Sequence, residues 1–364
     1  MLKARAIVLV LSLAFFSAAM FAIQQQTSTA PSSNSPNGQS HPGQAQAPTL
    51  QGCPQLPDGS EVLWGMALQM QTVPPQSLTE MKPLIDPKEP SVLGVLDIIT
   101  LNSKVYKNIR NLRVWLPANY FAPVNRKKRY SVLYMQDGQN LFDAATAELV
   151  EWKFDESVQF LTGSMRIGPM IVVGIDSTPR RANEYLPYPD PNNNELGKFE
   201  SQDVQGKKYG DFVINEVMPL IQKKYRVLTG AHYTGLGGAM YGADAALYAA
   251  LAHPGVFGKL LLESPVLLVG NEQLLKDAEK ATQFPEKIYI GVGTAEEADD
   301  KASTKDVEEV QQLEKILRAK GLGPTRLQVV VDEGAKPNEV AWSNRLQNSL
   351  LFLYGSDIHL IPGK

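Results

Sequence analysis

Short, largely apolar stretches rich in β-branched residues alternate along the chain with longer stretches whose apolar positions recur at helical spacing. The short stretches have the character of strands that are buried on both faces of a sheet. They predict seven strands, at residues 112–116, 131–135, 170–174, 233–236, 259–262, 288–291 and 327–331.

The longer stretches predict helices at residues 211–224, 243–252, 304–319 and 339–353. In the last of these, Val340, Leu346, Leu350 and Leu353 fall near one face. Buried strands separated by helices predict an α/β fold with a mainly parallel central sheet and helices on both faces. Ligands of such sheets gather beyond the carboxyl ends of the strands.

The N-terminus has a different pattern. Lys3 and Arg5 precede a largely apolar run at residues 6–23. A positive start followed by such a run is typical of a secretory signal peptide, and the run is also almost long enough to span a bilayer as an anchor. Both interpretations predict an exported protein, either periplasmic or secreted, or anchored in the inner membrane.

Residues 24–60 are rich in Gln, Ser, Pro, Gly, Thr and Asn and hold almost no aromatic or β-branched residues. Such a segment cannot bury enough apolar surface to order itself, so we expect a disordered polar linker. The folded body is then residues 61–364, a length that suits one α/β domain.

The amino-acid composition excludes several classes of function. The chain has 364 residues, a formal net charge of −3, one cysteine and four histidines, so we expect no disulfide framework, no metal site and no general affinity for nucleic acid. Gly235, Gly237 and Gly238 fail as a dinucleotide turn because the third glycine position holds Met240, and we expect no cofactor. The basic run at residues 126–129 predicts a solvated loop before a strand, because nothing aromatic interleaves it, and a patch for anionic lipid or nucleic acid is the alternative.

One short segment of the sequence points to a particular protein family. Residues 134–143 read Tyr-Met-Gln-Asp-Gly-Gln-Asn-Leu-Phe-Asp, and this resembles the early strand-to-loop segment of the esterase D-like and enterochelin-esterase-like family of the α/β-hydrolase fold. Further similar strings follow in the family's order. They lie at residues 171–176, 183–187, 209–226, 247–258, 263–265 and 292–296.

The resemblance implies an α/β-hydrolase fold and ester hydrolysis by a serine, a histidine and an acid. The nucleophile sits on a strained strand-to-helix turn between glycines, and a histidine takes its proton. Aligned on that turn, Gly238 and Gly242 occupy the glycine positions and Met240 stands at the nucleophile position. Pro337 stands at the position of the histidine. A thioether has no proton to lose, and a proline side chain has no acceptor.

The resemblance also assigns roles to residues other than the nucleophile and the base. The resemblance implies Glu296 as the candidate acid, although it could equally belong to a solvated acidic loop with Glu297, Asp299 and Asp300. It also implies oxyanion-hole positions at Gly138, Gln139 and Tyr241, a pocket residue at Trp342, and a structural serine at Ser264.

The four histidines offer no evident replacement for the base. His41 lies in the linker, His232 precedes the strand that leads to Met240, His253 follows a helix, and His359 is in the C-terminal tail. The main hypothesis is therefore an exported esterase-family protein that lacks ester hydrolysis and binds a small ester-like or other ligand, or a partner. The alternatives are a hydrolase with a non-standard site, in which Tyr241, Asp137 or Glu296 does chemistry, and a structural envelope protein.

Overall fold

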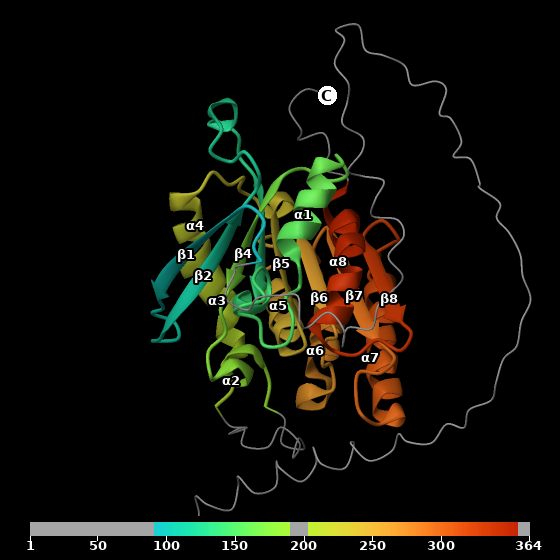
Figure 1. The fold of residues 1–364 in the computed structure, drawn as a ribbon. Coiled ribbons are helices and arrows are strands. Elements are labelled where there is room, and N and C mark those ends of the chain that lie inside the picture. Colours follow the sequence, from blue (N-terminus) through green and yellow to red (C-terminus); the bar gives the residue numbers. More distant parts are fainter. Residues whose placement is uncertain (1–90, 190–202, 356–364) are drawn as a thin grey trace, which may run out of the picture. The chain divides into compact units, whose positions relative to one another are not determined.

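The computed structural model describes residues 91–189 and 203–355 of the chain (Figure 1). The signal or anchor segment, the linker and the expected start of the body at residue 61 lie outside the described residues, as do His41 and His359. No helix within these two described ranges is both long and apolar enough to cross a membrane.

An eight-stranded sheet forms the centre of the described body, with the strand order β1-β2-β4-β3-β5-β6-β7-β8. β1 and β2 are antiparallel to their neighbours, and all pairs from β4 to β8 are parallel. The fold is therefore the predicted α/β-hydrolase type, with a mainly parallel sheet. The strands are β1 (Val95–Asn102), β2 (Ile109–Leu116), β3 (Ser131–Gln136), β4 (Met170–Ile175), β5 (Thr234–Ala239), β6 (Lys259–Glu263), β7 (Lys287–Gly293) and β8 (Leu327–Asp332).

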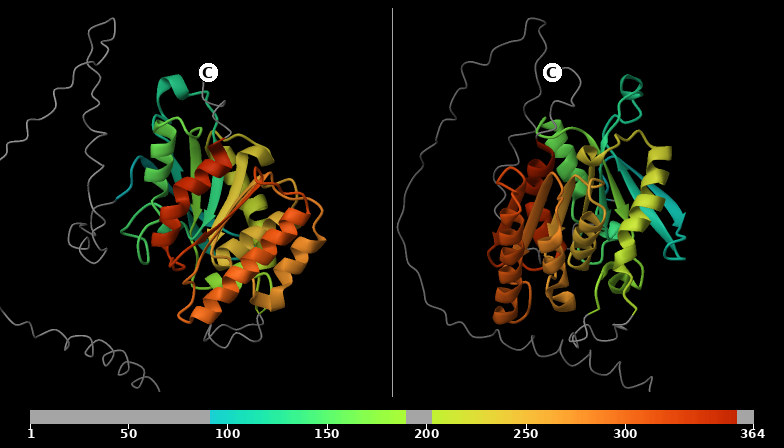
Figure 2. Two further views of the ribbon diagram at one scale, coloured as in Figure 1. Left: turned by 90° about the vertical axis from the view of Figure 1, so that its right-hand side faces the viewer. Right: turned by 180° about the vertical axis from the view of Figure 1, so that it is seen from behind.

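The α-helices lie in two layers, one on each face of the sheet (Figure 2). Their bounds are α1 (Phe154–Gly163), α2 (Arg181–Tyr185), α3 (Tyr209–Phe212), α4 (Met218–Lys224), α5 (Tyr241–Ala252), α6 (Val269–Lys280), α7 (Asp300–Ala319) and α8 (Glu339–Tyr354). Short 3-10 turns occur at Pro123–Asn125, Gly138–Asn140, Gly206–Lys208 and Ala231–Tyr233, and a π-helical segment, Val213–Val217, joins α3 to α4.

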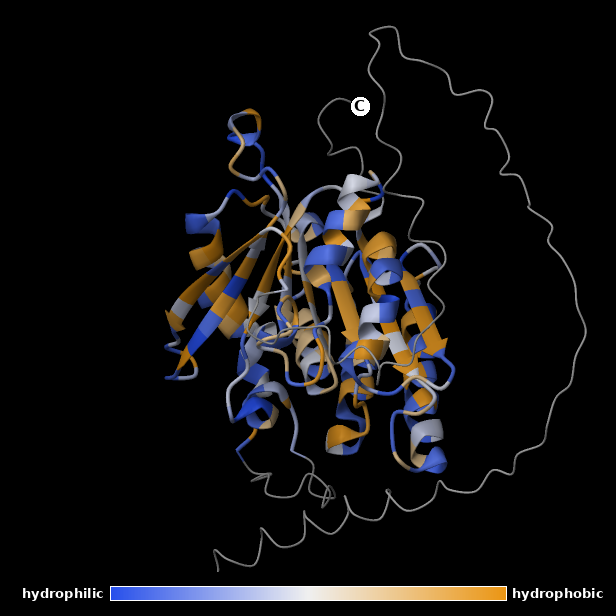
Figure 3. Cartoon of the chain, in the orientation of Figure 1, coloured by the Kyte–Doolittle hydropathy of each residue, from blue (hydrophilic) through white to orange (hydrophobic). Residues whose placement is uncertain are grey.

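Two hydrophobic cores follow from the alternation of side chains across the strands. Val132 and Tyr134 of β3 join the core that also holds buried residues of α3, α5, α6 and α7. Leu133 and Met135 join the other core, which is shared with α1 and α8. Because β3 is buried along its whole length, both of its faces are apolar, and the strands stand out as hydrophobic in Figure 3.

The predicted elements are found with shifted ends, and several were missed. The strand expected at 233–236 runs from Thr234 to Ala239, while Tyr233 belongs to the preceding 3-10 turn. The helix expected at 211–224 begins at Tyr209 and contains the π-helical segment. β1 was missed because it is an edge strand with no fully buried position. The helices α1, α2 and α6 were missed too, and α6 contains backbone at positive φ at residues 270–272 that breaks helical periodicity.

Candidate functional site

The turn between β5 and α5 holds Met240 in a strained conformation. Its backbone has φ 52° and ψ −125°, a region that side-chain-bearing residues rarely occupy. The Met240 N–H donates to the carbonyl oxygen of Glu263, and its own carbonyl oxygen accepts from the N–H groups of Ala243 and Asp244. The residue therefore sits at a sharp strand-to-helix corner, as the comparison with the family's nucleophile turn predicts.

Close packing of glycines accounts for this corner. A Cβ on Gly238 would lie 2.6 Å from Gln136 Oε1 and 2.8 Å from the carbonyl carbon of Gly242. A Cβ on Gly242 would lie 3.3 Å from Cβ of Gln136. The two turn glycines therefore pack directly on each other and on the end of β3, and this packing fixes the path of the chain around Met240.

The Met240 side chain is half-buried and packs against the core shared by α1 and α8. That core includes Trp152 and Trp342, whose rings lie 5.0 Å apart. A thioether is apolar and flexible, so it suits the margin of such a core. Met240 thus lies at the edge of a hydrophobic core.

The turn after the neighbouring strand carries a hydrogen-bonded serine. Ser264 follows β6, has φ 47° and is 3% exposed. Its hydroxyl donates to Glu296 Oε1 at 2.8 Å and accepts from Trp342 Nε1 at 2.9 Å. Sequence reasoning named all three residues separately, but no spacing indicated that they form one chain of hydrogen bonds.

Glu296 lies beyond the end of β7 and is tied to the backbone as well. Its Oε1 also accepts from the Gly293 N–H. Burial raises the pKa of Glu296, while the hydrogen bonds from Gly293 and Ser264 act in the opposite direction. Glu296 therefore occupies a partly buried polar site, whereas Asp299 caps the start of α7 by accepting from the Ala302 N–H.

Pro337 lies in the loop between β8 and α8, close to the same edge of the sheet. Two residues earlier, the carbonyl oxygen of Ala335 accepts from the N–H of Ala295 at 3.0 Å, which joins this loop to the one that carries Glu296. Met240 is joined to the end of β6 by its hydrogen bond to Glu263, and the next residue, Ser264, is joined to Glu296. The structure thus brings the segments of Met240, Glu296 and Pro337 together at the carboxyl edge of the sheet.

Gly138 and Gln139 follow β3 in a tight 3-10 turn. A Cβ on Gly138 would lie 2.6 Å from the carbonyl carbon of Gly174, so only glycine fits there. The Gln139 side chain is held on both sides by Ser177: its Nε2 donates to the Ser177 hydroxyl, and its Oε1 accepts from the Ser177 N–H. These residues form an ordered loop after β3, and their role as oxyanion-hole positions stays a prediction.

An ion pair that sequence reasoning did not assign lies beside this loop. Arg181 of α2 forms a bidentate pair with Asp137, with both N–O distances at 2.8 Å, and also donates to the carbonyl oxygen of Ala239. The guanidinium lies 6.0 Å from the centre of the Tyr241 ring. Arg181 therefore links β3, β5 and the start of α5, and only its position before residues 183–187 could have drawn attention to it.

A second buried pair lies beneath the Ser264 turn. Arg345 of α8 donates through Nε and Nη2 to Glu263 Oε2, and through Nη1 to Asp332. Burial raises the pKa of Glu263 to about 7, and the Arg345 charge opposes this. The carboxyl ends of β6 and β8 are thus joined by a charged group on α8.

The remaining histidines lie elsewhere. His232 is in the 3-10 turn before β5 and contacts Glu286, and His253 caps the end of α5 near Asp211. Both positions agree with the predictions for these residues and are at the amino edge of the sheet. In the described ranges, no group of three or more His, Cys, Asp or Glu residues is arranged to hold a metal ion.

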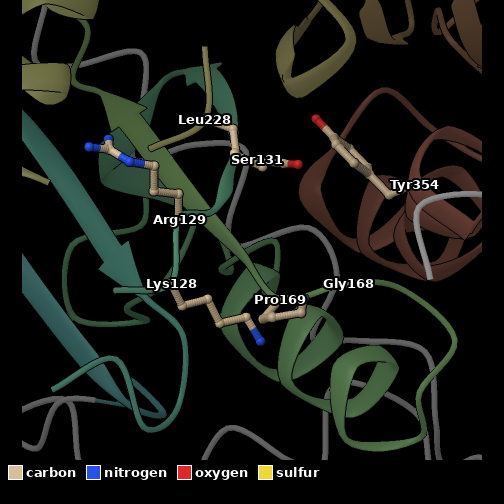
Figure 4. A pocket seen from close by; sticks show the side chains of 7 residues that line it. All are labelled: Lys128, Arg129, Ser131, Gly168, Pro169, Leu228 and Tyr354. Carbon is tan, nitrogen blue, oxygen red and sulfur yellow. The ribbon is translucent and has the colours of Figure 1, made fainter. Parts of the chain in front are cut away.

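Two pockets of the described body lie away from Met240, Glu296 and Pro337. The first has a volume of about 10 Å³, enough for roughly one water, and lies at the amino edge beside Ser131 and Tyr354 (Figure 4). The second has about 290 Å³ and is lined by Tyr188, Tyr248, Leu251, Ala252, Asp277, Lys280 and Ala281.

Comparison with known proteins decides the family. The model of the family described as "Putative esterase" matches residues 103–353, which is more than half of the chain. The chain belongs to this family. The uncharacterized protein YbbA of Bacillus subtilis (strain 168) is 24% identical over 250 residues, covering 68% of this chain and 94% of YbbA.

Two solved structures have a similar fold. The BES protein from Bacillus cereus superimposes with a TM-score of 0.57 at 19% identity, covering 73% of this chain and 98% of that chain. The siderophore hydrolase EstB from Aspergillus nidulans superimposes with a TM-score of 0.55 at 18% identity, covering 74% and 98% of the two chains. At these identities the likeness establishes the shared α/β-hydrolase fold.

Proposed function

We propose that this esterase-family protein is exported, does not hydrolyse esters, and acts by binding a ligand or a protein partner. The observation that carries the proposal is the Met240 corner. Its backbone keeps the strained geometry of a nucleophile turn, while its side chain is a thioether packed against an apolar core. An acyl-enzyme needs a nucleophile that can lose a proton to a nearby base.

The position of Pro337 supports the same proposal. A hydrogen bond between Ala295 and Ala335 joins its loop to the loop of Glu296, which is consistent with the base position that the family resemblance gives to Pro337. A proline there leaves the family's three-part mechanism without a base. The two substitutions occur in segments far apart in sequence, so one local misalignment does not account for both.

The test is ester turnover by the purified full chain on short-chain aryl esters. We expect rates no higher than those of an unrelated protein, because the oxyanion-hole positions alone give only a weak rate enhancement. A turnover of about 1 s⁻¹ or more, near ordinary enzyme rates, would contradict the proposal.

The double variant Met240→Ser with Pro337→His tests whether a nucleophile and a base are the only groups that the site lacks for ester hydrolysis. We expect it to gain measurable hydrolysis and covalent labelling by a serine-directed fluorophosphonate. The single variant Met240→Ser is the matched control, and it should gain neither, because its hydroxyl still lacks a base. Activity in this single variant would mean that another group acts as the base.

One observation favours a second candidate, a hydrolase with a non-standard site. The Ser264 hydroxyl donates to Glu296, whose pKa is raised by burial, so this pair holds a hydroxyl next to a basic group. Fluorophosphonate labelling of the wild type that disappears in Ser264→Ala and persists in Ser343→Ala would support this candidate. If the wild type is not labelled at Ser264 and shows no turnover, the second candidate is wrong.

A further inference from the structure

The loop between β2 and β3 projects from the amino edge of the sheet, opposite the edge that holds Met240 (Figure 1). The surrounding sequence is strongly one-sided in charge. Residues 98–136 hold eight Lys and Arg and no Asp or Glu, in a chain whose net charge is −3. Four of the eight are consecutive, at residues 126–129.

The same projection holds two large apolar side chains in solvent. Phe121 is 70% exposed and Val124 is 88% exposed. Isolated apolar residues on a surface need no explanation, but these two share one narrow loop with the basic run. The loop thus combines apolar and cationic groups.

Hydrogen bonds within the loop hold these side chains outward. The N–H groups of Tyr120, Ala122, Asn125, Arg126 and Lys128 donate to carbonyl oxygens of the same loop. The Asn125 side chain adds a bond to the carbonyl oxygen of Asn119. A loop ordered in this way presents Phe121 and Val124 without the cost of ordering them on binding.

The base of the projection is clamped to the body. The Arg226 guanidinium lies 3.9 Å from the centre of the Tyr120 ring, and the Arg226 N–H donates to the Tyr120 hydroxyl. The Tyr130 ring lies 5.3 Å from that of Tyr120. The loop is therefore fixed relative to the sheet.

The basic side chains of the run are available for an external anion. Arg126, Lys127 and Arg129 are exposed, and none of the four basic residues pairs with a carboxylate of the described ranges. Arg129 donates through Nη1 to the carbonyl oxygen of Val227, which directs it along the base of the loop.

We propose that this projection is a docking element for an anionic lipid surface, with Phe121 and Val124 entering the interface and the basic run contacting phosphate headgroups. Lipid surfaces bind apolar side chains and cationic side chains together, and each Lys or Arg near such a surface adds to the attraction. As an anchor, the apolar run at residues 6–23 would hold this chain beside a membrane. Nucleic acid is the less suitable partner, because of the two exposed apolar side chains only Phe121 has a ring on which a base could stack, and no aromatic residue interleaves the basic run at residues 126–129.

The experiment uses the full chain with Cys53→Ser and Val124→Cys, labelled at position 124 with an environment-sensitive fluorophore. The protein is reconstituted with vesicles of phosphatidylglycerol and phosphatidylethanolamine, or of phosphatidylcholine alone. Because the fluorophore reports on the loop itself, the readout is separate from any insertion of residues 6–23. We expect a blue shift with the anionic vesicles and none with the zwitterionic ones.

Two variants provide the controls. Arg126→Gln with Lys127→Gln changes exposed side chains only, and it should weaken the association of the loop with lipid by about fivefold for each charge removed. A label at Lys301→Cys, at the opposite edge of the sheet, should show no shift. The proposal is overturned by an absent shift at position 124, by equal shifts with both kinds of vesicle or at both label positions, or by a shift with single-stranded RNA and none with vesicles.

Discussion

Two neighbouring turns at the carboxyl edge of the sheet differ in what holds them. After β5, Met240 has φ 52° and packs its side chain against apolar groups. After β6, Ser264 has φ 47° and is held by hydrogen bonds to Trp342 and Glu296. The first turn owes its shape to the backbone packing of glycines, and the second to its polar side-chain partners. A strained strand-to-helix turn can therefore keep its geometry without a hydrogen-bonded side chain at its corner.

The largest loss of stability is expected from Gly238→Val, which disrupts the packing of Gly238 on Gly242 in the first turn. The added side chain would meet the backbone of Gly242, which cannot move away without opening the corner. We expect a loss of about 3 kcal/mol in the free energy of unfolding, measured by urea denaturation. Gly163→Ala is the control: its Cβ meets no atom within 4 Å, and it should be neutral. A loss below about 1 kcal/mol for Gly238→Val would refute the packing argument.

Ser264→Ala tests the polar second turn. It leaves the Trp342 Nε1–H without an acceptor and removes one donor from Glu296. We expect a loss of about 2 kcal/mol in the free energy of unfolding, because buried polar groups that lose their partners are costly. Ser343→Ala, whose hydroxyl bonds only to the carbonyl oxygen of Val340 in its own helix, should change stability by less than about 0.5 kcal/mol. Equal effects of the two variants would contradict the role given to Ser264.

Glu263 lies between the two turns, and its titration should appear in the pH dependence of stability. Burial raises its pKa from the ordinary 4.5 to about 7, so between these values the folded protein binds more protons than the unfolded chain. Its contribution is full below pH 4.5 and is lost as the pH rises through about 7. In this window, Glu263→Gln should make the fall in stability shallower by up to about 1.4 kcal/mol per pH unit.

The measurement is the free energy of unfolding by urea at several pH values between 4.5 and 7. The exposed Glu308→Gln on α7 is the matched control, and its profile should run parallel to that of the wild type. If the Glu263→Gln profile is also parallel to the wild type, the titration belongs to another group.

The smallest effect is expected from Met240→Gly. Glycine adopts the backbone angles of this corner without strain, which offsets the lost packing of the thioether. We expect a net change within about 1 kcal/mol, whereas Met135→Ala in the same core should cost about 2 kcal/mol or more. A cost for Met240→Gly as large as that for Met135→Ala would mean that the side chain, and not the glycine packing, stabilises the turn.

Much of the fold could be predicted because its strands are buried and its helices amphipathic. All seven predicted strands and four predicted helical segments are present, since their apolar patterns are strong. β1 escaped because an edge strand such as this one, with Asp97 and Thr100 among its apolar residues, carries only a weak pattern. The helix α2, which begins at Arg181, has only five residues, and a helix this short shows no apolar periodicity in the sequence.

By itself, the sequence determined the family, because strings such as residues 134–143 are read directly from the chain, and it predicts Met240 and Pro337 at the nucleophile and base positions. Tertiary structure alone decided that Ser264, Glu296 and Trp342 share hydrogen bonds and that Arg181 pairs with Asp137. These contacts join residues from 32 to 78 positions apart. No local pattern encodes such pairs, because they arise only when parallel strands bring their carboxyl ends to one edge of the sheet.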